Sequence, residues 1–413
     1  MNKIVLKNVR PFVNGKFEAP TTMNLADGKW VNEDLTDAPA FDAGGALALP
    51  ALFGLGLDFK EPLRDDIYDF KDGVNAMRRG GFYGGLYESS DNAIDDSRKL
   101  SAIKQISSFA GFAFSFLGAF SVGYKCKELT EMIELAEEGA VGFGDGNQDA
   151  TRTRFLRLAM EYGSMTGKRF FFMPLDESLR HHGLVHEGHY ADTLGMKGVP
   201  RVAETIAAFR ILEMARFLKV PVHFKQVSCG ETLKLIENAR EQGVDVTCET
   251  APHYLTLDET DLKEDGRFKM NPPLRSPEDR DALVEGLQDG TVDMVATDHA
   301  PHSAEEKSRG LAGSLMGVVG LECAFPVLYT GLVETGKLSL EALVERMSLA
   351  PARRFGIDNQ DCYAIFDLNA QEIIDPERFQ SMGRATPFAG WSVHAAHVGT
   401  VYRGKLLEKG RNT

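Results

Sequence analysis

Histidine and aspartate side chains that could bind a metal ion are concentrated in two segments of the chain. Residues 179–189 contain four histidines, and residues 298–302 contain one aspartate followed by two histidines. Imidazole nitrogens and carboxylate oxygens are the usual oxygen and nitrogen ligands of zinc. The first segment lies in a predicted loop, so we expect solvated surface there. For the second, two interpretations stay open: hydrogen bonds that fix a strand and its loop, or a direct part in chemistry.

Short apolar runs alternate with amphipathic stretches between about residues 50 and 356, and these are the elements that must position such side chains. Examples of the runs are 139–143, 169–173, 220–224 and 292–296. Repeated β-then-α units over about 300 residues favour a parallel (β/α)8 barrel of the TIM type. We assign residues 51–359 to it. The aromatic run Phe170 to Phe172 is expected in the core rather than on a binding face.

Both ends of the chain have a β pattern instead. Residues 1–50 read as short alternating strands with a turn at Asn14-Gly15, and residues 360–413 end in further strand patterns. We therefore predict that 1–50 and 360–413 together form one small β-sandwich domain beside the barrel.

Composition limits the partners. With 60 acidic and 46 basic residues, the net charge of −14 would repel nucleic acid and anionic membrane surfaces. Five cysteines without a CxxC pair suit a reducing compartment, and we expect them to be buried as small apolar groups. No stretch resembles a signal peptide or the roughly 20 apolar residues of a membrane span. We expect a cytoplasmic protein.

Several motifs, in this order and spacing, resemble those of the dihydroorotases, which are cyclic amidohydrolases of pyrimidine biosynthesis. The resemblance spans nearly the whole chain and implies the barrel with its β-sandwich. The motifs are Lys60-Glu61-Pro62, Gly80-Gly81-Phe82, Thr250-Ala251-Pro252-His253-Tyr254, Asn271-Pro272-Pro273-Leu274-Arg275, Ala296-Thr297-Asp298-His299-Ala300-Pro301-His302, Gly317 to Glu322, Pro351-Ala352 and Thr386 to Trp391.

The resembled enzymes hold zinc at the barrel mouth. Zinc lowers the pKa of a bound water towards about 7 and polarises the carbonyl of the cyclic amide. The resemblance implies a His-x-His on the first barrel strand, and these positions correspond to Gly56 and Asp58. The first histidine anywhere in this chain is His181, so no such pair exists on a first strand.

The other implied ligand positions are altered as well. The acidic position corresponds to Asp145, and the two later histidines to Pro174 and Gln226; only Asp298 is kept. His223 is three residues from Gln226, so on a strand it would face the other side. We therefore expect no cofactor and no firmly bound metal, with Asp58, Asp145 and Asp298 as weak candidate ligands.

The implied substrate contacts are kept in part. Lys60 replaces an arginine of the resembled enzymes and is a less specific partner for a carboxylate, while Asn271 and His302 match substrate-contacting positions. Glu88 to Asp91 adds negative charge, with Ser90 where an asparagine would lie, so an anionic substrate is disfavoured.

The buried carboxylates at the mouth need compensation. Asp298 would need a proton or a partner, for which Lys60 and Lys225 are candidates. We also expect Asp58 and Lys60 to form an ion pair or a water network.

Three functions remain open. The first is a non-catalytic dihydroorotase-like subunit that assembles with aspartate carbamoyltransferase, as some bacterial chains that resemble this one do, and Asp298 would then be vestigial. The second is a working cyclic amidohydrolase whose rearranged site uses Asp58, Asp145 and Asp298 around one ion, with zinc as the cofactor. The third is a small-molecule sensor that uses the remnant pocket around Asn271 and His302. We expect an oligomer in the first case.

Overall fold

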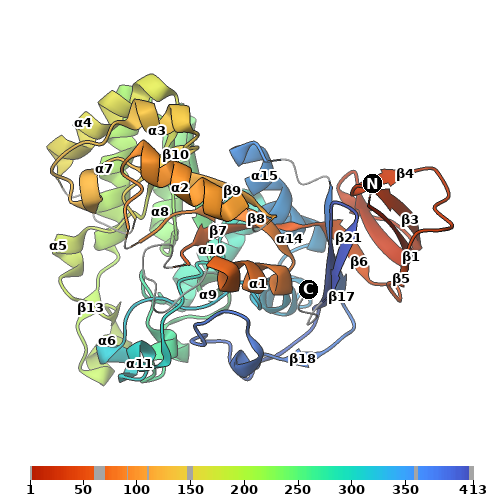
Figure 1. The fold of residues 1–413 in the computed structure, drawn as a ribbon. Helices are drawn as coiled ribbons and strands as arrows, with labels where there is room; N and C mark the ends of the chain where they lie inside the picture. Colours follow the sequence, from red (N-terminus) through yellow and green to blue (C-terminus); the bar gives the residue numbers. More distant parts are fainter. Residues whose placement is uncertain are drawn as a thin grey trace.

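A barrel and a β-sheet domain lie side by side in the computed structural model, which describes residues 2–59, 70–90, 92–108, 111–146, 152–357 and 361–408 (Figure 1). The middle of the chain forms the barrel, and both chain ends contribute strands to the β-sheet domain. In the described part of the chain, no helix is both long and apolar enough to cross a membrane.

Eight parallel strands follow one another around the barrel in chain order. They are β7 (Leu52–Leu57), β8 (Phe82–Tyr87), β9 (Ala113–Ala119), β10 (Gly142–Gly144), β11 (Arg169–Phe172), β14 (Val222–Phe224), β15 (Val246–Thr250) and β16 (Met294–Val295). Hydrogen bonds from Thr297 N to Leu55 O (3.0 Å) and from His299 N to Gly56 O (2.9 Å) join the last strand to the first. The predicted fold class is confirmed, because the alternating pattern does correspond to β-then-α units.

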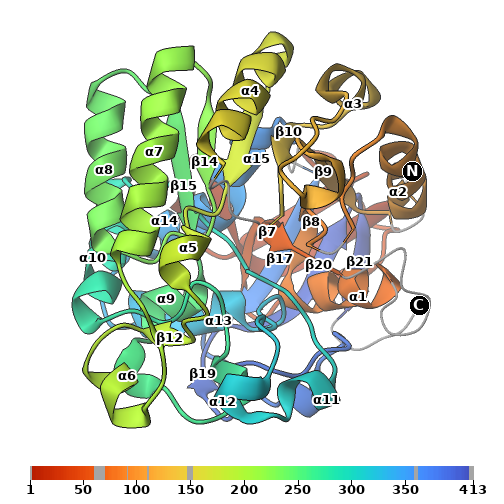
Figure 2. The same ribbon diagram turned by 90° about the vertical axis from the view of Figure 1, so that its left-hand side faces the viewer.

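Helices cover the outside of the barrel (Figure 2). The longer ones are α1 (Phe70–Gly80), α2 (Ser97–Ser108), α3 (Met132–Glu138), α4 (Thr153–Gly163), α7 (Val202–Leu218), α8 (Gly230–Glu241) and α10 (Pro277–Asp289). Shorter elements lie in the connections: α5 (Glu177–Arg180), β12 (Val185–His186), α6 (His189–Leu194), β13 (Gly198–Val199), α9 (Pro252–Thr256), α11 (Ala304–Lys307), α12 (Gly310–Gly313), α13 (Ala324–Leu328), α14 (Leu340–Val344) and α15 (Ala350–Phe355).

The two chain ends share one nine-stranded sheet with the order β21-β20-β17-β6-β1-β3-β4, and β2 and β5 also pair with β1. Strand β1 connects the two parts of this sheet. It pairs with β3 from Lys3 to Val9, with a register shift between Leu6 and Val9, and with β6 at Arg10 and Pro11. The strands are β1 (Lys3–Val13), β2 (Lys16–Phe17), β3 (Thr21–Ala26), β4 (Lys29–Val31), β5 (Ala40–Asp42), β6 (Leu47–Pro50), β17 (Cys362–Asp367), β20 (Ala396–Tyr402) and β21 (Lys405–Glu408); β18 (Glu372–Ile373) and β19 (Ser392–Val393) form a separate pair.

Aromatic side chains fill the barrel near the N-terminal ends of the strands. The ring of Phe355, at the end of α15, lies 6.2 Å from that of Phe53 and 5.8 Å from that of Phe171, measured between centroids. The run Phe170 to Phe172 is buried, as predicted, and so are all five cysteines. This packing closes one end of the barrel and leaves polar side chains for the other, where (β/α)8 barrels carry their sites.

Candidate functional site at the barrel mouth

Asp298 lies just beyond β16 and is contacted by Gln226, just beyond β14, and by His253 on α9. The Gln226 amide donates a short hydrogen bond to Asp298 Oδ1, and His253 Nε2 lies 3.4 Å from Asp298 Oδ2. Burial raises the pKa of Asp298 to about 7 and lowers the pKa of His253 to about 3. Both shifts disfavour the charged forms, so we describe the His253 contact as one with a neutral imidazole rather than as an ion pair.

The backbone around this pair is unusual. Gln226 has φ 53° and Asp298 has φ 46°, a left-handed conformation that L residues other than asparagine and aspartate seldom adopt. Such a conformation costs roughly 1–2 kcal/mol per residue. Two residues in this conformation that hydrogen-bond to each other form a locally strained contact, of the kind that the surrounding structure must hold in place.

The first strand places Gly56 and Asp58 at the mouth. Gly56 has φ 63°, and a Cβ atom built on it would lie 3.3 Å from Asp298 Cα. An imidazole at this position would therefore be strained and would press on the backbone of Asp298. Asp58 is buried, and its Oδ2 accepts a hydrogen bond from the Ser90 hydroxyl. Lys60, its predicted partner, lies outside the described residues.

Asp145 follows β10 and is enclosed by donors from one turn. Its Oδ1 accepts from the backbone N of Phe120 (3.1 Å) and Ser121 (2.9 Å), while Oδ2 accepts from the Ser121 hydroxyl and from Cys126 Sγ at 3.4 Å. Burial raises its pKa to about 7, against the opposing effect of these hydrogen bonds. These contacts fix the loop after β9 and occupy both carboxylate oxygens.

Polar side chains also extend down the inside of the barrel. His223 on β14 contacts Thr247 Oγ1 (2.8 Å) and Glu249 Oε2 (3.2 Å) on β15. Burial raises the pKa of Glu249 to about 8 and lowers that of His223 to about 3. Both groups are therefore mostly uncharged at neutral pH. His223 and Gln226 have separate partners in the structure.

Lys225 pairs with Glu88, and this corrects two expectations. Lys225 Nζ donates to Glu88 Oε2 and to Gly146 O (2.7 Å), and Gly146 N donates to Glu88 Oε1 (3.0 Å). Lys225 is therefore not the main partner of Asp298, which is Gln226. Glu88 adds no unbalanced negative charge at the mouth, because Lys225 compensates it. Gly144 makes room for this pair, since a Cβ atom there would clash with Glu88.

The pairing of Lys225 with Glu88 was missed in the sequence, and so was Glu249. Glu88 and Lys225 are 137 residues apart, so no local pattern connects them. A signal was nevertheless present: Lys225 follows the apolar run Val220–Phe224 directly, and Glu249 lies within Val246–Thr250, which reads as a buried strand. A charged residue in such a strand must have a buried partner, because an unpaired buried charge is very costly.

Asn271 and His302 lie on segments that the structure brings side by side. The buried Lys307 Nζ donates to Lys269 O (3.1 Å) and Gly317 O (2.7 Å), which joins the two segments. Asn271 Nδ2 lies 3.7 Å from Met173 Sδ. His302 Nε2 lies 2.7 Å from Met316 O, and its Nδ1 lies 3.4 Å from Glu306 Oε2. Both nitrogens of His302 therefore have protein contacts that fix this loop.

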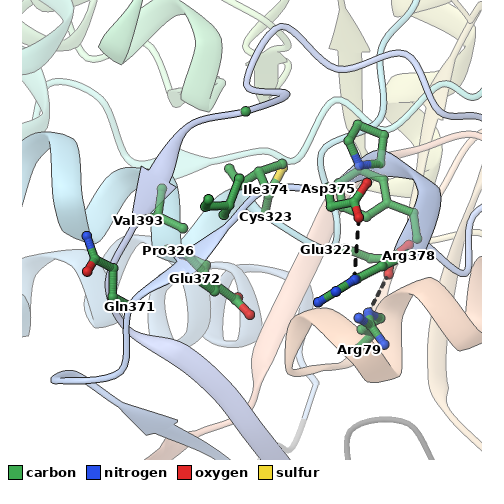
Figure 3. Close-up of a pocket in the computed structure, with 14 residues that line it drawn as sticks. Arg79, Glu322, Cys323, Pro326, Gln371, Glu372, Ile374, Asp375, Arg378 and Val393 are labelled. Atoms are coloured by element: carbon green, nitrogen blue, oxygen red, sulfur yellow. Dashed lines mark ion pairs between the residues drawn. The ribbon is translucent and has the colours of Figure 1, made fainter.

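His299 is tied to the C-terminal part of the chain rather than to the mouth. Its Nδ1 accepts from Gly320 N (3.3 Å), and its Nε2 lies 3.4 Å from the Ser381 hydroxyl. Glu322 Oε1 accepts from Ser381 N (3.0 Å), and Glu322 Oε2 lies 3.1 Å from Arg79 Nε on α1, a pair shown in Figure 3. Glu322, from the motif that starts at Gly317, thus connects α1 to the segment that supports His299.

The histidine-rich segment 179–189 does not form a metal centre in the described structure. His181, His182 and His189 are exposed, as expected. For His186 the expectation of solvated surface was wrong: it is buried in β12, with Nδ1 3.4 Å from an Arg275 guanidinium nitrogen. Burial and this neighbouring cation lower its pKa to about 4.

The residues present do not fit the zinc that the resemblance implies. At the implied positions are Gly56, Asp58, Asp145, Pro174, Gln226 and Asp298, of which three carry a carboxylate and none carries an imidazole. Each of the three carboxylates accepts a short hydrogen bond from a neighbouring side chain. Across the described ranges, no three His, Cys, Asp or Glu side chains are grouped so that they could hold a metal ion.

Comparisons with known proteins agree with this architecture, although no family model matches the chain. A dihydroorotase from Bacillus caldolyticus is 36% identical over 391 residues, which cover 92% of this chain and 90% of that protein. A dihydroorotase from Geobacillus kaustophilus is 36% identical over 389 residues, covering 92% and 91%. The L-hydantoinase from Arthrobacter aurescens has the same fold, with a TM-score of 0.85 at 24% identity over 100% of this chain and 98% of that chain. The chain therefore belongs to the dihydroorotase family.

Proposed function

We propose that this member of the dihydroorotase family does not hydrolyse cyclic amides, and that it serves pyrimidine biosynthesis as a structural partner of aspartate carbamoyltransferase. The observation that carries the first part is the contact between Gln226 and Asp298. An amide lies where a zinc ligand is implied, and it donates a hydrogen bond to Asp298, the implied ligand that is clearly kept. A carboxylate bound in this way is a poor metal ligand, and no imidazole compensates for it.

The interior contacts support the same proposal. In a hydrolase the polar groups at the barrel mouth must be available to a metal, a water or a substrate. Here Asp58 is paired with Ser90, Asp145 with the turn at Ser121, and Lys225 with Glu88. Such internal pairs stabilise a fold without serving a reaction, which is what a structural subunit needs.

An exposed apolar stripe on α7 supports an assembly role. Its members follow one another at intervals of four, three and eight residues: Val202, Ile206, Phe209 and Phe217. Their side chains have exposed fractions of 47%, 47%, 56% and 72%. Residues at this spacing lie on one face of a helix. The α7 helix lies on the outer surface beside α4 and α8 (Figure 2). Exposed apolar patches of this kind are typical of protein interfaces.

The test of the partnership is co-expression with the aspartate carbamoyltransferase of the same organism, followed by mass photometry of the purified mixture. We expect one species that contains both chains in a fixed ratio. Two species that do not interact, at concentrations up to those in the cell, would remove the transferase from the proposal without affecting the conclusion about hydrolysis.

The alternative is a working cyclic amidohydrolase with a rearranged site, and it is favoured by the name dihydroorotase that the 36% identical relatives carry. It requires Asp58, Asp145 and Asp298 to release their present partners and to share one ion, zinc in the family. It predicts stoichiometric metal and turnover of dihydroorotate that a chelator abolishes. Elemental analysis of the purified protein separates the two proposals directly.

A further inference from the structure

A cavity of about 810 Å³ lies between the barrel and the β-sheet domain, away from the barrel mouth. The barrel contributes Arg78 near the end of α1 and Phe112 just before β9, and strands of the β-sheet domain contribute most of the remaining wall. Ligand sites occur preferentially at such domain interfaces.

The charge of this lining is opposite to that of the chain. Lys3, Arg78 and Lys405 carry positive charge, and none of the described residues that line the cavity is acidic. The whole chain has a net charge of −14. A group of three cations without a lining carboxylate creates a local positive potential that attracts anions.

The guanidinium of Arg78, at the wall of this cavity, has fewer hydrogen-bond partners than donors. Its Nε is buried and has no hydrogen-bond partner, and its NH1 makes one long contact of 3.5 Å with Asn75 Oδ1. Burial lowers the pKa of this guanidinium. Because Nε is closed off from solvent, an anion in the cavity would contact the terminal nitrogens of this guanidinium, and a planar carboxylate or a phosphate matches their geometry.

Aromatic rings form the apolar part of the wall. The rings of Phe112 and Tyr402 are nearly parallel, with an interplanar angle of 8° and centroids 5.7 Å apart, and the guanidinium carbon of Arg78 lies 5.4 Å from the Phe112 centroid. Phe41 and Leu406 extend this surface within the β-sheet domain. The rings thus lie beside the cations, so one ligand can contact both.

We propose that this cavity binds an organic anion with a flat apolar body, either a nucleoside phosphate or an aromatic carboxylate. The anionic group pairs with Lys3, Arg78 and Lys405, and the apolar body packs against Phe41, Phe112 and Tyr402. Because the ligand contacts both domains, it stabilises their arrangement. This site is independent of the barrel mouth and of the proposed loss of hydrolysis.

The test is calorimetric titration of the full chain at low salt with AMP, benzoate, adenosine and inorganic phosphate. We expect AMP or benzoate to bind at least roughly tenfold more tightly than adenosine and phosphate, because only they combine both groups. Whichever of AMP and benzoate binds more tightly shows whether the site prefers a phosphate or a carboxylate. The affinity should fall as ionic strength rises.

Charge-reversal variants test whether the ligand binds in this cavity. Lys3→Glu combined with Lys405→Glu changes two exposed side chains and should weaken binding roughly tenfold or more. Lys16→Glu makes the same charge change at an exposed position of the sheet outside the cavity, and should leave the affinity within about twofold. The proposal is overturned if neither AMP nor benzoate binds, if phosphate alone binds as tightly, or if the double variant binds like the parent chain.

Discussion

At the scale of single residues, the proposed loss of metal binding rests on contacts between polar side chains at the barrel mouth rather than on an absence of polar groups. Gln226 and Asp298 bind each other, and Gly56 has a left-handed backbone that no imidazole would adopt without strain. At Gly56 the backbone conformation itself therefore disfavours an imidazole. Restoring histidines one by one is not expected to restore a zinc site.

This leads to a prediction for the variant Gly56→His/Asp58→His/Gln226→His. We expect it to be destabilised by roughly 1–2 kcal/mol through Gly56 alone, because histidine is placed in a left-handed conformation. We also expect less than one equivalent of zinc after dialysis, measured by elemental analysis. The double variant Asp58→His/Gln226→His is the control for stability. One or more zinc ions firmly held by the triple variant would show that the backbone does adapt.

Glu249 gives a prediction for pH dependence. Its pKa is about 8 in the folded chain and about 4.5 when exposed, so the folded state keeps a proton that the unfolded chain releases. The stability that this proton contributes is full below about pH 4.5 and is lost as the pH rises through about 8.

In Glu249→Gln the loss of stability between pH 5 and 8.5 should be smaller than in the parent chain, by on the order of 2 kcal/mol in unfolding free energy from urea titrations. The control Glu241→Gln, at an exposed position on α8, should follow the parent curve. Parallel curves for the parent and the Glu249 variant would mean that Glu249 is charged in the folded protein.

At the scale of secondary-structure elements, buried carboxylates connect helices to the loops at the barrel mouth. Glu204 on α7 is fully buried, and its oxygens accept from Ser228 N (3.1 Å), Cys229 N (3.0 Å) and Thr232 Oγ1 (2.9 Å) at the start of α8. Arg275 lies 3.7 Å from the same carboxylate. One side chain thus joins α7, α8 and the segment before α10.

We predict that Glu204→Ala lowers the unfolding free energy by about 3 kcal/mol or more, because it leaves several buried donors and the Arg275 charge without a partner. Glu204→Gln keeps one acceptor oxygen and should cost about half as much. Thermal and urea unfolding measure both. Glu231→Gln, at an exposed position on α8, should change stability by less than about 0.5 kcal/mol. Equal costs for the Ala and Gln variants would contradict the role of the oxygen.

The elements themselves were predictable, whereas their contacts were only partly so. Apolar runs such as 220–224 and 292–296 became β14 and β16 because short buried strands have a clear composition. The missing imidazoles could also be recognised, since no histidine precedes His181. The partner of Asp298 could not be predicted, because Gln226 and Asp298 leave the strand geometry through positive φ angles that periodicity does not encode.

At the scale of the whole molecule, the α7 stripe is the surface on which we expect assembly. Phe209→Asp combined with Phe217→Asp should reduce co-elution with aspartate carbamoyltransferase at least roughly tenfold, because the two most exposed apolar side chains of the stripe are replaced by charges. Ile373→Asp changes an equally exposed apolar residue (67%) in another part of the molecule and should leave co-elution unchanged. An unchanged complex with the double variant would exclude α7 as the contact.

The central claim is that this barrel does not hold the zinc that hydrolysis of a cyclic amide requires. The most direct measurement is the zinc content of the purified parent chain after dialysis, determined together with dihydroorotate turnover in the same preparation. We predict well under one zinc ion per chain and no turnover above the background without protein. One or two zinc ions per chain, with turnover that a chelator removes and zinc restores, would contradict the claim.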